Sequence, residues 1–309
     1  MTFYMTAPLF ALIAMGYLAV RLKFITKDAN VGLGRFALYF GVPAIIFRAL
    51  SQSDFTNVLN SHFILAYAGG GLMSFIIIFF ISKYLTKATL TESGLNAFGS
   101  ALPNSIIIGA PLLIQIYGSL PSGAFTMALL VENILIFPLA LILMDLGIHK
   151  DSSSSIISSL RTILTGLPKN QFLMAIVLGL CVSAFQIPIP DVLGKIIDLM
   201  GQAAPAVSLF FIGGTLVGST LNGRLGTISL VACGKLMIHP LLVAFIITLL
   251  PEMDTQLRVS AIVFASCPML TIYPIVASKY ALAQEATSTL LLTTIASFLT
   301  LTVSLWLVL

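Results

Sequence analysis

A few ionisable side chains stand inside otherwise apolar segments of this chain. Glu132 lies within Leu-Leu-Val-Glu-Asn-Ile-Leu-Ile-Phe, and Lys235 and His239 lie one helical turn apart in a later apolar run. A carboxylate at bilayer depth costs at least about 2.5 kcal/mol unless it is protonated, paired or turned toward a cavity. The sequence therefore supports two predictions for Glu132, a proton-exchanging group or a core ion pair with Lys235. It favours a structural role for His239.

Two apolar stretches, Phe98–Gly118 and Phe264–Ala281, carry residues that interrupt a helix. These residues are Pro103, Asn104, Gly109 and Pro111 in the first stretch, and Pro268 and Pro274 in the second. Proline removes a backbone donor and clashes with the carbonyl four residues back. Broken backbone at membrane depth persists only where protein or a water-filled cavity satisfies its polar groups. Paired interruptions of this kind indicate the binding site of a transporter.

The residues around these breaks could bind an anion. Asn104 and Ser105 are suited to cap the second half of the first interrupted helix, and Thr271 is suited to do so in the second. A helix N-terminus carries roughly +0.5 charge and free N–H groups, so two facing ends would hold a carboxylate without an arginine. The alternative is that Asn104 only satisfies the broken backbone. The predicted binding residues are Pro103, Asn104, Ser105, Gly109, Pro268, Thr271 and Tyr273.

Composition defines the setting in which these residues work. The chain is 58% hydrophobic and 8% charged, whereas soluble domains carry about 25% charged residues. This indicates an all-α polytopic membrane protein. The basic residues occur singly, which argues against nucleic-acid binding. The three cysteines lie in apolar runs without metal-site spacing, so no metal or other cofactor is expected. No nucleotide-binding or membrane-protease motif is present, so neither an ATP-driven pump nor an enzyme is expected.

Ten apolar segments have membrane-spanning length. They are Phe3–Arg21, Asn30–Leu50, His62–Ile81, Leu95–Tyr117, Ala124–Asp145, Asn170–Gln186, Leu193–Val217, Leu225–Leu250, Leu257–Lys279 and Thr287–Leu309. Most lysines and arginines fall on one side if the first loop is cytoplasmic, which predicts that both termini are external. The serine-rich residues 151–169 are then a cytoplasmic linker between residues 1–150 and 170–309.

The two halves of the chain resemble each other. The corresponding residues are Gly16 and Gly179, Asp28 and Asp191, Pro43 and Pro205, and Pro103 and Pro268. Each half holds five spans, an odd number, so the second half must enter the membrane from the opposite side. The sequence therefore predicts two inverted five-helix repeats. Arg35 and Asp198 lie near span ends, and we expect them to extend toward the membrane surface.

The order and spacing of several strings resemble the auxin efflux carrier family, whose bacterial members include permeases for malonate, malate and other organic acids. These strings are Gly16-Tyr17, Val42-Pro43-Ala44, Asn104 with Gly109-Ala110-Pro111, Leu178-Gly179-Leu180, Ile187-Pro188-Ile189-Pro190, Pro205 with Gly213, Lys235-Leu236 with Pro240, and Ala277 with Tyr280. The resemblance implies the fold of bile-acid symporters and sodium/proton antiporters. In that fold, spans 1, 2, 6 and 7 form a scaffold. Spans 3–5 and 8–10 form a mobile core, in which discontinuous helices 4 and 9 cross mid-membrane.

A secondary transporter for small organic anions such as carboxylates is the function that this resemblance implies. It would be an integral protein of the plasma (inner) membrane, in contact with lipid. Coupling to H⁺, or uniport, is favoured over Na⁺, because the core lacks carboxylates beyond Glu132. A homodimer through the scaffold helices is the expectation at family level. Ile272 and Tyr273 stand where the family has a small or amide residue. A non-transporting membrane sensor or assembly protein on the same fold is therefore the alternative.

Overall fold

A computed structural model describes residues 2–52, 59–148, 170–218 and 223–309. The expected linker, residues 151–169, lies outside them. The described residues are helical, apart from turns and loops. The helices are α1 (Thr2–Arg21), α2 (Lys27–Phe36), η1 (Ala37–Gly41), α3 (Val42–Ser51), α4 (Ser61–Phe80), η3 (Ile81–Leu85), α5 (Leu90–Ala101), η4 (Ser105–Gly109), α6 (Ala110–Tyr117), α7 (Ser122–Leu130), η5 (Val131–Ile136), α8 (Phe137–Ile148), α10 (Gln171–Ala184), α11 (Asp191–Thr215), α12 (Leu225–Cys233), η7 (Gly234–Ile238), α13 (His239–Leu249), α14 (Thr255–Ser266), α15 (Tyr273–Ser278) and α16 (Ala283–Val308).

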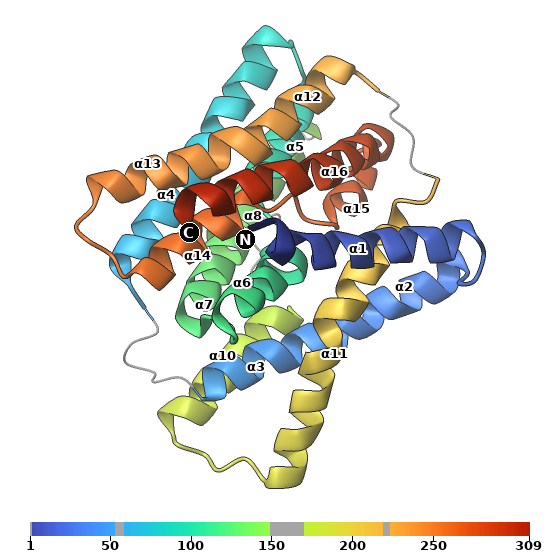
Figure 1. Ribbon diagram of the computed structural model, residues 1–309. Coiled ribbons are helices and arrows are strands. Elements are labelled where there is room, and N and C mark those ends of the chain that lie inside the picture. Colours follow the sequence, from blue (N-terminus) through green and yellow to red (C-terminus); the bar gives the residue numbers. More distant parts are fainter. Residues whose placement is uncertain (1, 53–58, 149–169, 219–222) are drawn as a thin grey trace. The chain divides into compact units, whose positions relative to one another are not determined.

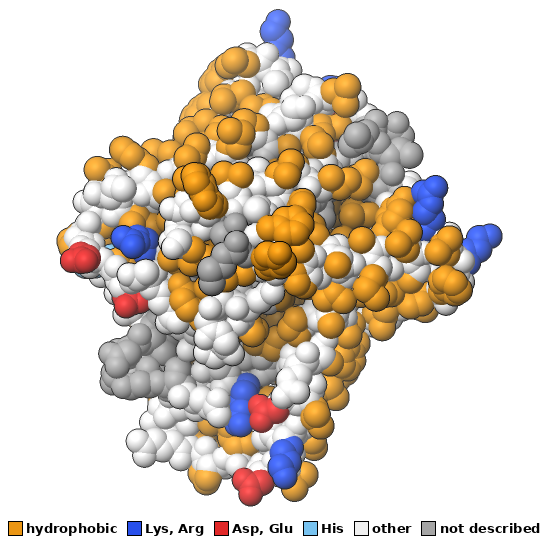
Figure 2. Space-filling model, in the orientation of Figure 1, with side chains coloured by type: hydrophobic (Ala, Val, Ile, Leu, Met, Phe, Trp, Pro, Cys, Tyr) orange, Lys and Arg blue, Asp and Glu red, His pale blue; other side chains and the backbone are white. Residues whose placement is uncertain are grey.

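Among the described residues, 7 helices are long and apolar enough to cross a membrane. They are Phe3–Arg21, Lys27–Ser51, Ser61–Leu85, Ser122–Ile148, Asp191–Thr215, Leu225–Leu249 and Ala283–Val308. The other three predicted spans are shorter or divided, because α10 has 14 residues and the two proline-interrupted stretches are split into α5 with α6 and α14 with α15. Figure 2 shows a face on which apolar side chains predominate and charged side chains are few, as a lipid-facing surface requires.

The helices divide into two compact units. The first consists of residues 1–60, 106–127 and 168–218. Within it, α1 packs along α11 and α10 packs on α3 (Figure 1). Glycines permit the approach of α1 to α11, because a Cβ at Gly16 would collide with the carbonyl oxygen of Phe210, and one at Gly213 with that of Ile13. Small residues of this kind let helices in a membrane pack backbone to backbone.

The second unit consists of residues 61–105, 128–167 and 219–309. Here α4 lies beside α13, as Figure 1 shows, and α5 packs against both α4 and α8. The last helix, α16, packs against α12, α14 and α15. The buried polar side chains that the sequence singled out, Glu132, Lys235 and His239, all belong to this unit.

Several of these helices contain a π-helical segment, in which each turn holds an extra residue. Four such segments end two residues before a proline, and the pairs are Gly41 with Pro43, Gly109 with Pro111, Ile136 with Pro138, and Ile238 with Pro240. Proline lacks an N–H and clashes with the carbonyl four residues back. In each case that carbonyl lies inside the widened segment, where the backbone has room for it. Such segments occur frequently at functional sites.

An exposed ion pair joins the ends of three helices in the second unit. Nη2 of Arg224, the residue before α12, lies 2.7 Å from Oε1 of Glu92 on α5 and 3.3 Å from Oε2 of Glu285 on α16. Glu92 also forms a capping box with Thr89 at the start of α5. Burial opposes ionisation of Glu92, but the Thr89 hydrogen bonds and the Arg224 charge outweigh it and hold the pKa of this carboxyl below its ordinary value.

The contact between α1 and α11 can be tested with glycine substitutions. We expect Gly16→Ala and Gly213→Ala to lower the melting temperature of the detergent-purified protein, because the new methyl group meets backbone that cannot rotate away. Overpacking of this kind costs about 1–3 kcal/mol. Gly32→Ala, on α2, is the matched control, because a Cβ at Gly32 has no atom within 4 Å. Equal melting temperatures for Gly16→Ala and Gly32→Ala would contradict the close approach.

Candidate functional site

The two proline-interrupted stretches meet within the second unit. Helix α5 ends at Ala101 and α14 ends at Ser266. The extended residues that follow them pair in an isolated antiparallel bridge between Pro103 and Met269. The N–H of Asn104 donates to the carbonyl of Pro268 at 2.7 Å, and the N–H of Leu270 donates to the carbonyl of Leu102 at 3.3 Å. Each break therefore supplies hydrogen-bond partners for the backbone that the other leaves open.

Side chains from the two breaks also touch. Nδ2 of Asn104 donates to Oγ1 of Thr271 at 2.8 Å, and Asn104 is only 2% exposed. Thr271 does not cap the helix that follows, because the N-cap position of α15 is Ile272 and it makes no side-chain capping bond. The prediction of a cap at Thr271 was therefore wrong. With 6 residues, α15 is also short for a helix-dipole site, so the site depends more on the amide and hydroxyl.

The remaining predicted binding residues have different surroundings. The buried Gly109 is the last residue of η4, which follows the break at Pro103 and Asn104, and α6 begins at the next residue. The Tyr273 ring stacks on Phe98 with centroids 5.8 Å apart, and Tyr273 is 2% exposed. Tyr273 thus packs as a buried core aromatic against Phe98 of α5.

Glu132 lies in η5 and is 3% exposed. Its Oε1 accepts the Tyr67 hydroxyl at 2.6 Å and the Ser105 hydroxyl at 2.5 Å. Each hydroxyl has a single hydrogen, and both hydrogens are donated to Oε1 of Glu132. The two hydroxyl oxygens also lie 3.3 Å apart, but neither has a second hydrogen to donate across that contact. Hydrogen bonds of this length are typical of hydroxyl donors to a carboxylate. Ser105 directly follows Asn104, so this bond connects the break to the acid.

Lys235 has its own partners. Its Nζ donates to the carbonyl of Ala265 at 2.6 Å and lies 2.9 Å from Nδ1 of His239. The direct ion pair with Glu132 that the sequence offered as one alternative is absent among the described residues. In its charged form Lys235 can only donate, and in that case Nδ1 of His239 would accept and the ring proton would lie on Nε2. That buried nitrogen has no hydrogen-bond partner among the described residues.

Three of the polar residues lie in π-helical segments. Ser105 begins η4, Glu132 lies in η5 and Lys235 in η7. Analysis of the sequence missed both this pattern and Tyr67, the second donor to Glu132. Proline positions could have indicated the widened turns, because each of these three segments ends two residues before a proline. No signal in the sequence indicated Tyr67, which lies 65 residues away on α4.

Comparison with known proteins sets this arrangement in context. A family model described as membrane transport protein matches residues 2–307. The chain belongs to this membrane transport protein family. It is therefore a multi-pass integral membrane protein of a transporter family and not of an enzyme family.

Several named proteins are similar to this family member. The "Putative malonate transporter" of Rhizobium meliloti (strain 1021) is 27% identical over 304 residues, which cover 97% of this chain and 94% of that protein. The lysosomal cholesterol signaling protein of Mus musculus is 23% identical over 316 residues, covering 96% of this chain and 36% of that protein. Auxin efflux carrier component 4 of Arabidopsis thaliana is 28% identical over 142 residues, covering 45% of this chain and 22% of that protein.

The charge on Glu132 can be tested by measuring how much stability Tyr67→Phe costs in the wild type and in the Glu132→Gln variant. Hydrogen bonds to a charged group contribute about 1.5–3 kcal/mol, and those between neutral groups about 0.5–1.5 kcal/mol. We expect Tyr67→Phe to cost more stability in the wild type than in Glu132→Gln, measured by unfolding in detergent. Tyr84→Phe is the control, because Tyr84 is 70% exposed. An equal cost of Tyr67→Phe in both backgrounds would mean that Glu132 is uncharged in the wild type.

Proposed function

We propose that this protein is a secondary transporter that moves small organic anions such as carboxylates across the membrane by alternating access. The observation that carries the proposal is the pairing of the two helix breaks, with the Asn104 amide and the Thr271 hydroxyl in contact between them. Discontinuous helices at the interface of two repeats are the usual place for a transporter's substrate. In this proposal, an arriving carboxylate replaces Thr271 as the acceptor of the Asn104 amide.

The proposed architecture is ten spans in two inverted five-helix repeats. Packing within each unit supports it. In the first unit, α1 (span 1) packs on α11 (span 7), and α10 (span 6) packs on α3 (span 2). If span 6 repeats span 1 and span 7 repeats span 2, these two contacts are equivalent. In the second unit span 3 packs on span 8. The first unit contains spans 1, 2, 6 and 7 together with residues 106–127, which supports their assignment as the scaffold and the assignment of the second unit as the mobile core.

Substrate chemistry is argued from the Asn104 amide and from the relatives. An amide offers two N–H donors and no charge, so it can hold a carboxylate without binding it irreversibly. The name of the Rhizobium meliloti relative, which aligns over nearly the whole chain, supports a small dicarboxylate such as malonate. The import or export direction follows the gradients of substrate and proton in a transporter of this kind. The proposed setting is the inner membrane, with external termini and a homodimer through the scaffold.

Proton coupling would act through Ser105. Its hydroxyl belongs to the residue after Asn104 and donates to Glu132. A substrate that shifts the Asn104 break would lengthen the hydrogen bond from Ser105 to Glu132. The Glu132 carboxylate would then have one donor fewer, which favours its protonation. In this proposal H⁺ is favoured over Na⁺, because Glu132 is the one acid that contacts the break among the described residues.

Transport by the full chain in proteoliposomes tests the proposal. We expect uptake of labelled malonate by the wild type, and a loss of about tenfold in Asn104→Ala, because one buried hydrogen bond of about 1.4 kcal/mol corresponds to that factor. Gln115→Ala, an exposed amide on α6, is the matched control. Specific carboxylate binding without flux would favour the membrane-sensor alternative. The signaling protein among the relatives gives that alternative its support.

The coupling role of Glu132 has a separate test. We expect wild-type malonate uptake to rise with an imposed inward proton gradient, because protonation of Glu132 accompanies transport. We expect Glu132→Gln, which cannot exchange a proton, to lose this response while retaining malonate exchange. A Glu132→Gln variant with an unchanged rate and an unchanged pH dependence would show that Glu132 is a structural acid.

A further inference from the structure

Two turns of this chain have an unusual backbone at a lysine. One joins α1 to α2, as Figure 1 shows, and the other joins η3 to α5. The backbone angle φ is positive at a lysine in each turn, with a value of 62° at Lys23 and 55° at Lys87. Side chains other than glycine are disfavoured in this left-handed region, because their Cβ comes too close to the following carbonyl oxygen. The presence of lysine at both positions therefore requires an explanation.

The left-handed backbone by itself does not require a lysine. The turn after α10 is built in the same way around Gln186, where φ is 50°. Lys23, Lys87 and Gln186 each stand two residues after the end of a helix. An uncharged side chain thus serves this kind of turn in the same chain. What distinguishes the two lysine turns is their charge.

Exposed apolar side chains stand next to both lysines. Leu22 and Phe24 are exposed on either side of Lys23, and Phe24 is 81% exposed. Tyr84 and Leu85 are exposed before Lys87. Apolar side chains next to cations, at the end of a membrane-spanning helix, fit the boundary between lipid acyl chains and headgroups.

Both turns carry excess positive charge. Five basic side chains stand in or beside them, and these are Arg21, Lys23, Lys27, Lys83 and Lys87. Residues 21–28 include three basic side chains and one acidic one, and residues 83–89 include two basic ones and no acidic one, so each segment has a net charge of +2. None of the five basic side chains forms an ion pair within the described part of the chain. Arg21 donates to the Tyr17 hydroxyl at 2.8 Å, which positions its guanidinium without removing the charge.

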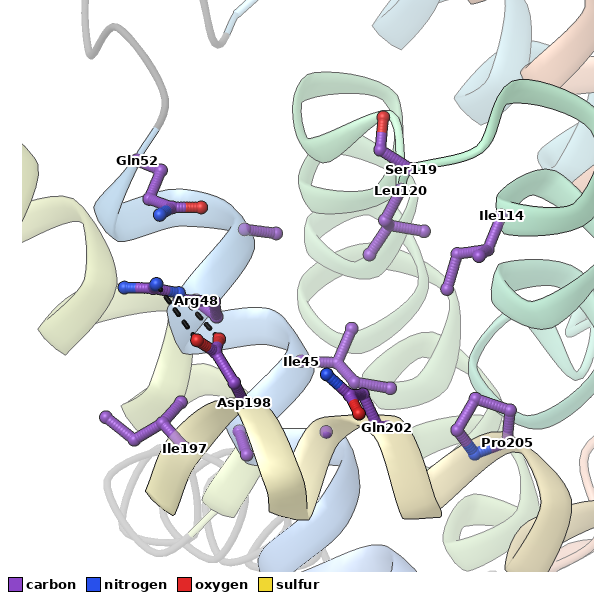
Figure 3. Close-up of a pocket in the computed structure, with 13 residues that line it drawn as sticks. Ile45, Arg48, Gln52, Ile114, Ser119, Leu120, Ile197, Asp198, Gln202 and Pro205 are labelled. Atoms are coloured by element: carbon purple, nitrogen blue, oxygen red, sulfur yellow. Dashed lines mark hydrogen bonds and ion pairs between the residues drawn. The ribbon is translucent and has the colours of Figure 1, made fainter. Parts of the chain in front are cut away.

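Basic side chains that reach a neighbouring helix are paired differently. Nε of Arg48 on α3 lies 2.7 Å from Oδ1 of Asp198 on α11, at the side of a cavity whose lining Figure 3 shows. The sequence predicts that Asp198 extends alone toward the membrane surface, and that prediction is wrong. Arg224 is paired with two glutamates at the helix ends of the second unit. The charges of the two lysine turns have no such partner among the described residues, so they are available to an anion outside the chain.

The predicted topology indicates which anion this is. If the first loop is cytoplasmic, both lysine turns lie at the cytoplasmic leaflet and the Gln186 turn lies at the outer one. Anionic lipids give the cytoplasmic leaflet a negative surface potential, and each lysine or arginine near it strengthens binding about fivefold. The Gln186 turn has exposed Phe185 and Ile187, but residues 171–194 contain no lysine or arginine. Lysine thus occurs in the turns that meet anionic lipid.

We propose that the two lysine turns bind anionic phospholipids. The lipid phosphate lies against Lys23 or Lys87 and the adjoining basic side chains, and the acyl chains lie against the exposed Leu22 and Phe24 or Tyr84 and Leu85. Basic residues also bias the orientation of a chain during membrane insertion. Lipid binding differs from that role because it persists in the purified protein. It requires neither transport nor the Asn104 site, so a failure of the proposed function leaves it standing, and the reverse also holds.

Lipid binding to the detergent-purified full chain, measured by native mass spectrometry, tests this proposal. We expect dioleoyl phosphatidylglycerol to bind at least about tenfold more tightly than dioleoyl phosphatidylcholine, which has the same chains and phosphate but no net charge. High salt should reduce this preference, because exposed charges are screened. Inorganic phosphate at the same concentration should not displace the lipid, because it has no acyl chains. Equal binding of the two lipids would overturn the proposal, and so would displacement by inorganic phosphate.

Variants identify the residues that hold the lipid. Lys23→Gln and Lys87→Gln give each turn the residue that the Gln186 turn already has. We expect the double variant K23Q/K87Q to bind phosphatidylglycerol about fivefold more weakly, and each single variant to affect half of the bound lipid. The melting temperature in neutral detergent should stay unchanged, because glutamine adopts this backbone elsewhere in the chain. The double variant K23R/K87R keeps the charge and should bind as the wild type does.

Lys195→Gln is the matched control, because it removes an exposed charge from α11 outside both turns. It should bind phosphatidylglycerol as the wild type does. A loss in Lys195→Gln equal to that in K23Q/K87Q would show that the lipid responds to the net charge of the chain, and would overturn the proposal. An unchanged affinity in K23Q/K87Q would overturn it as well.

Discussion

The structure depends on one constraint, which is that a helix broken in apolar surroundings must find new partners for its backbone. A bilayer offers no water for this purpose. Here the partner of one break is the other break, through the bonds from Asn104 to Pro268 and from Leu270 to Leu102. A single interrupted helix would leave these groups open, at a cost of several kcal/mol each. The two breaks therefore have to occur together, and α5 and α14 have to end facing each other.

Three buried polar side chains of the second unit lie in π-helical segments. Ser105, Glu132 and Lys235 lie in segments that proline has widened, and each finds a partner outside its own helix. In a regular α-helix every backbone group is already bonded, and a buried polar side chain has little to hold it. Widened turns relax that geometry. The π-helical segments and the buried polar contacts thus occur together in this unit.

The sequence predicted the parts of the structure that depend on local chemistry. Proline at 103 and 268 breaks a helix whatever surrounds it, so the two interruptions could be located from the sequence. The choice of partners could not, because it depends on which helix faces meet. The sequence offered an ion pair of Glu132 with Lys235 as one of two alternatives, whereas Lys235 contacts the Ala265 carbonyl and His239. Likewise Asp198 forms an ion pair with Arg48, which is 150 residues away in the sequence. No periodicity in either segment indicates that these two side chains pair.

The π-helical segments also affect where this chain could gain or lose a residue. Each residue of an α-helix advances about 100° around the axis, so an added residue would normally rotate everything beyond it onto another face. A π-helical segment absorbs the extra residue locally and keeps the helices on either side in phase. The chain could therefore lose one residue within η5 without turning α7 relative to α8. Related chains can be expected to carry single-residue gaps there, and with such a gap they would lose the wide turn that holds Glu132.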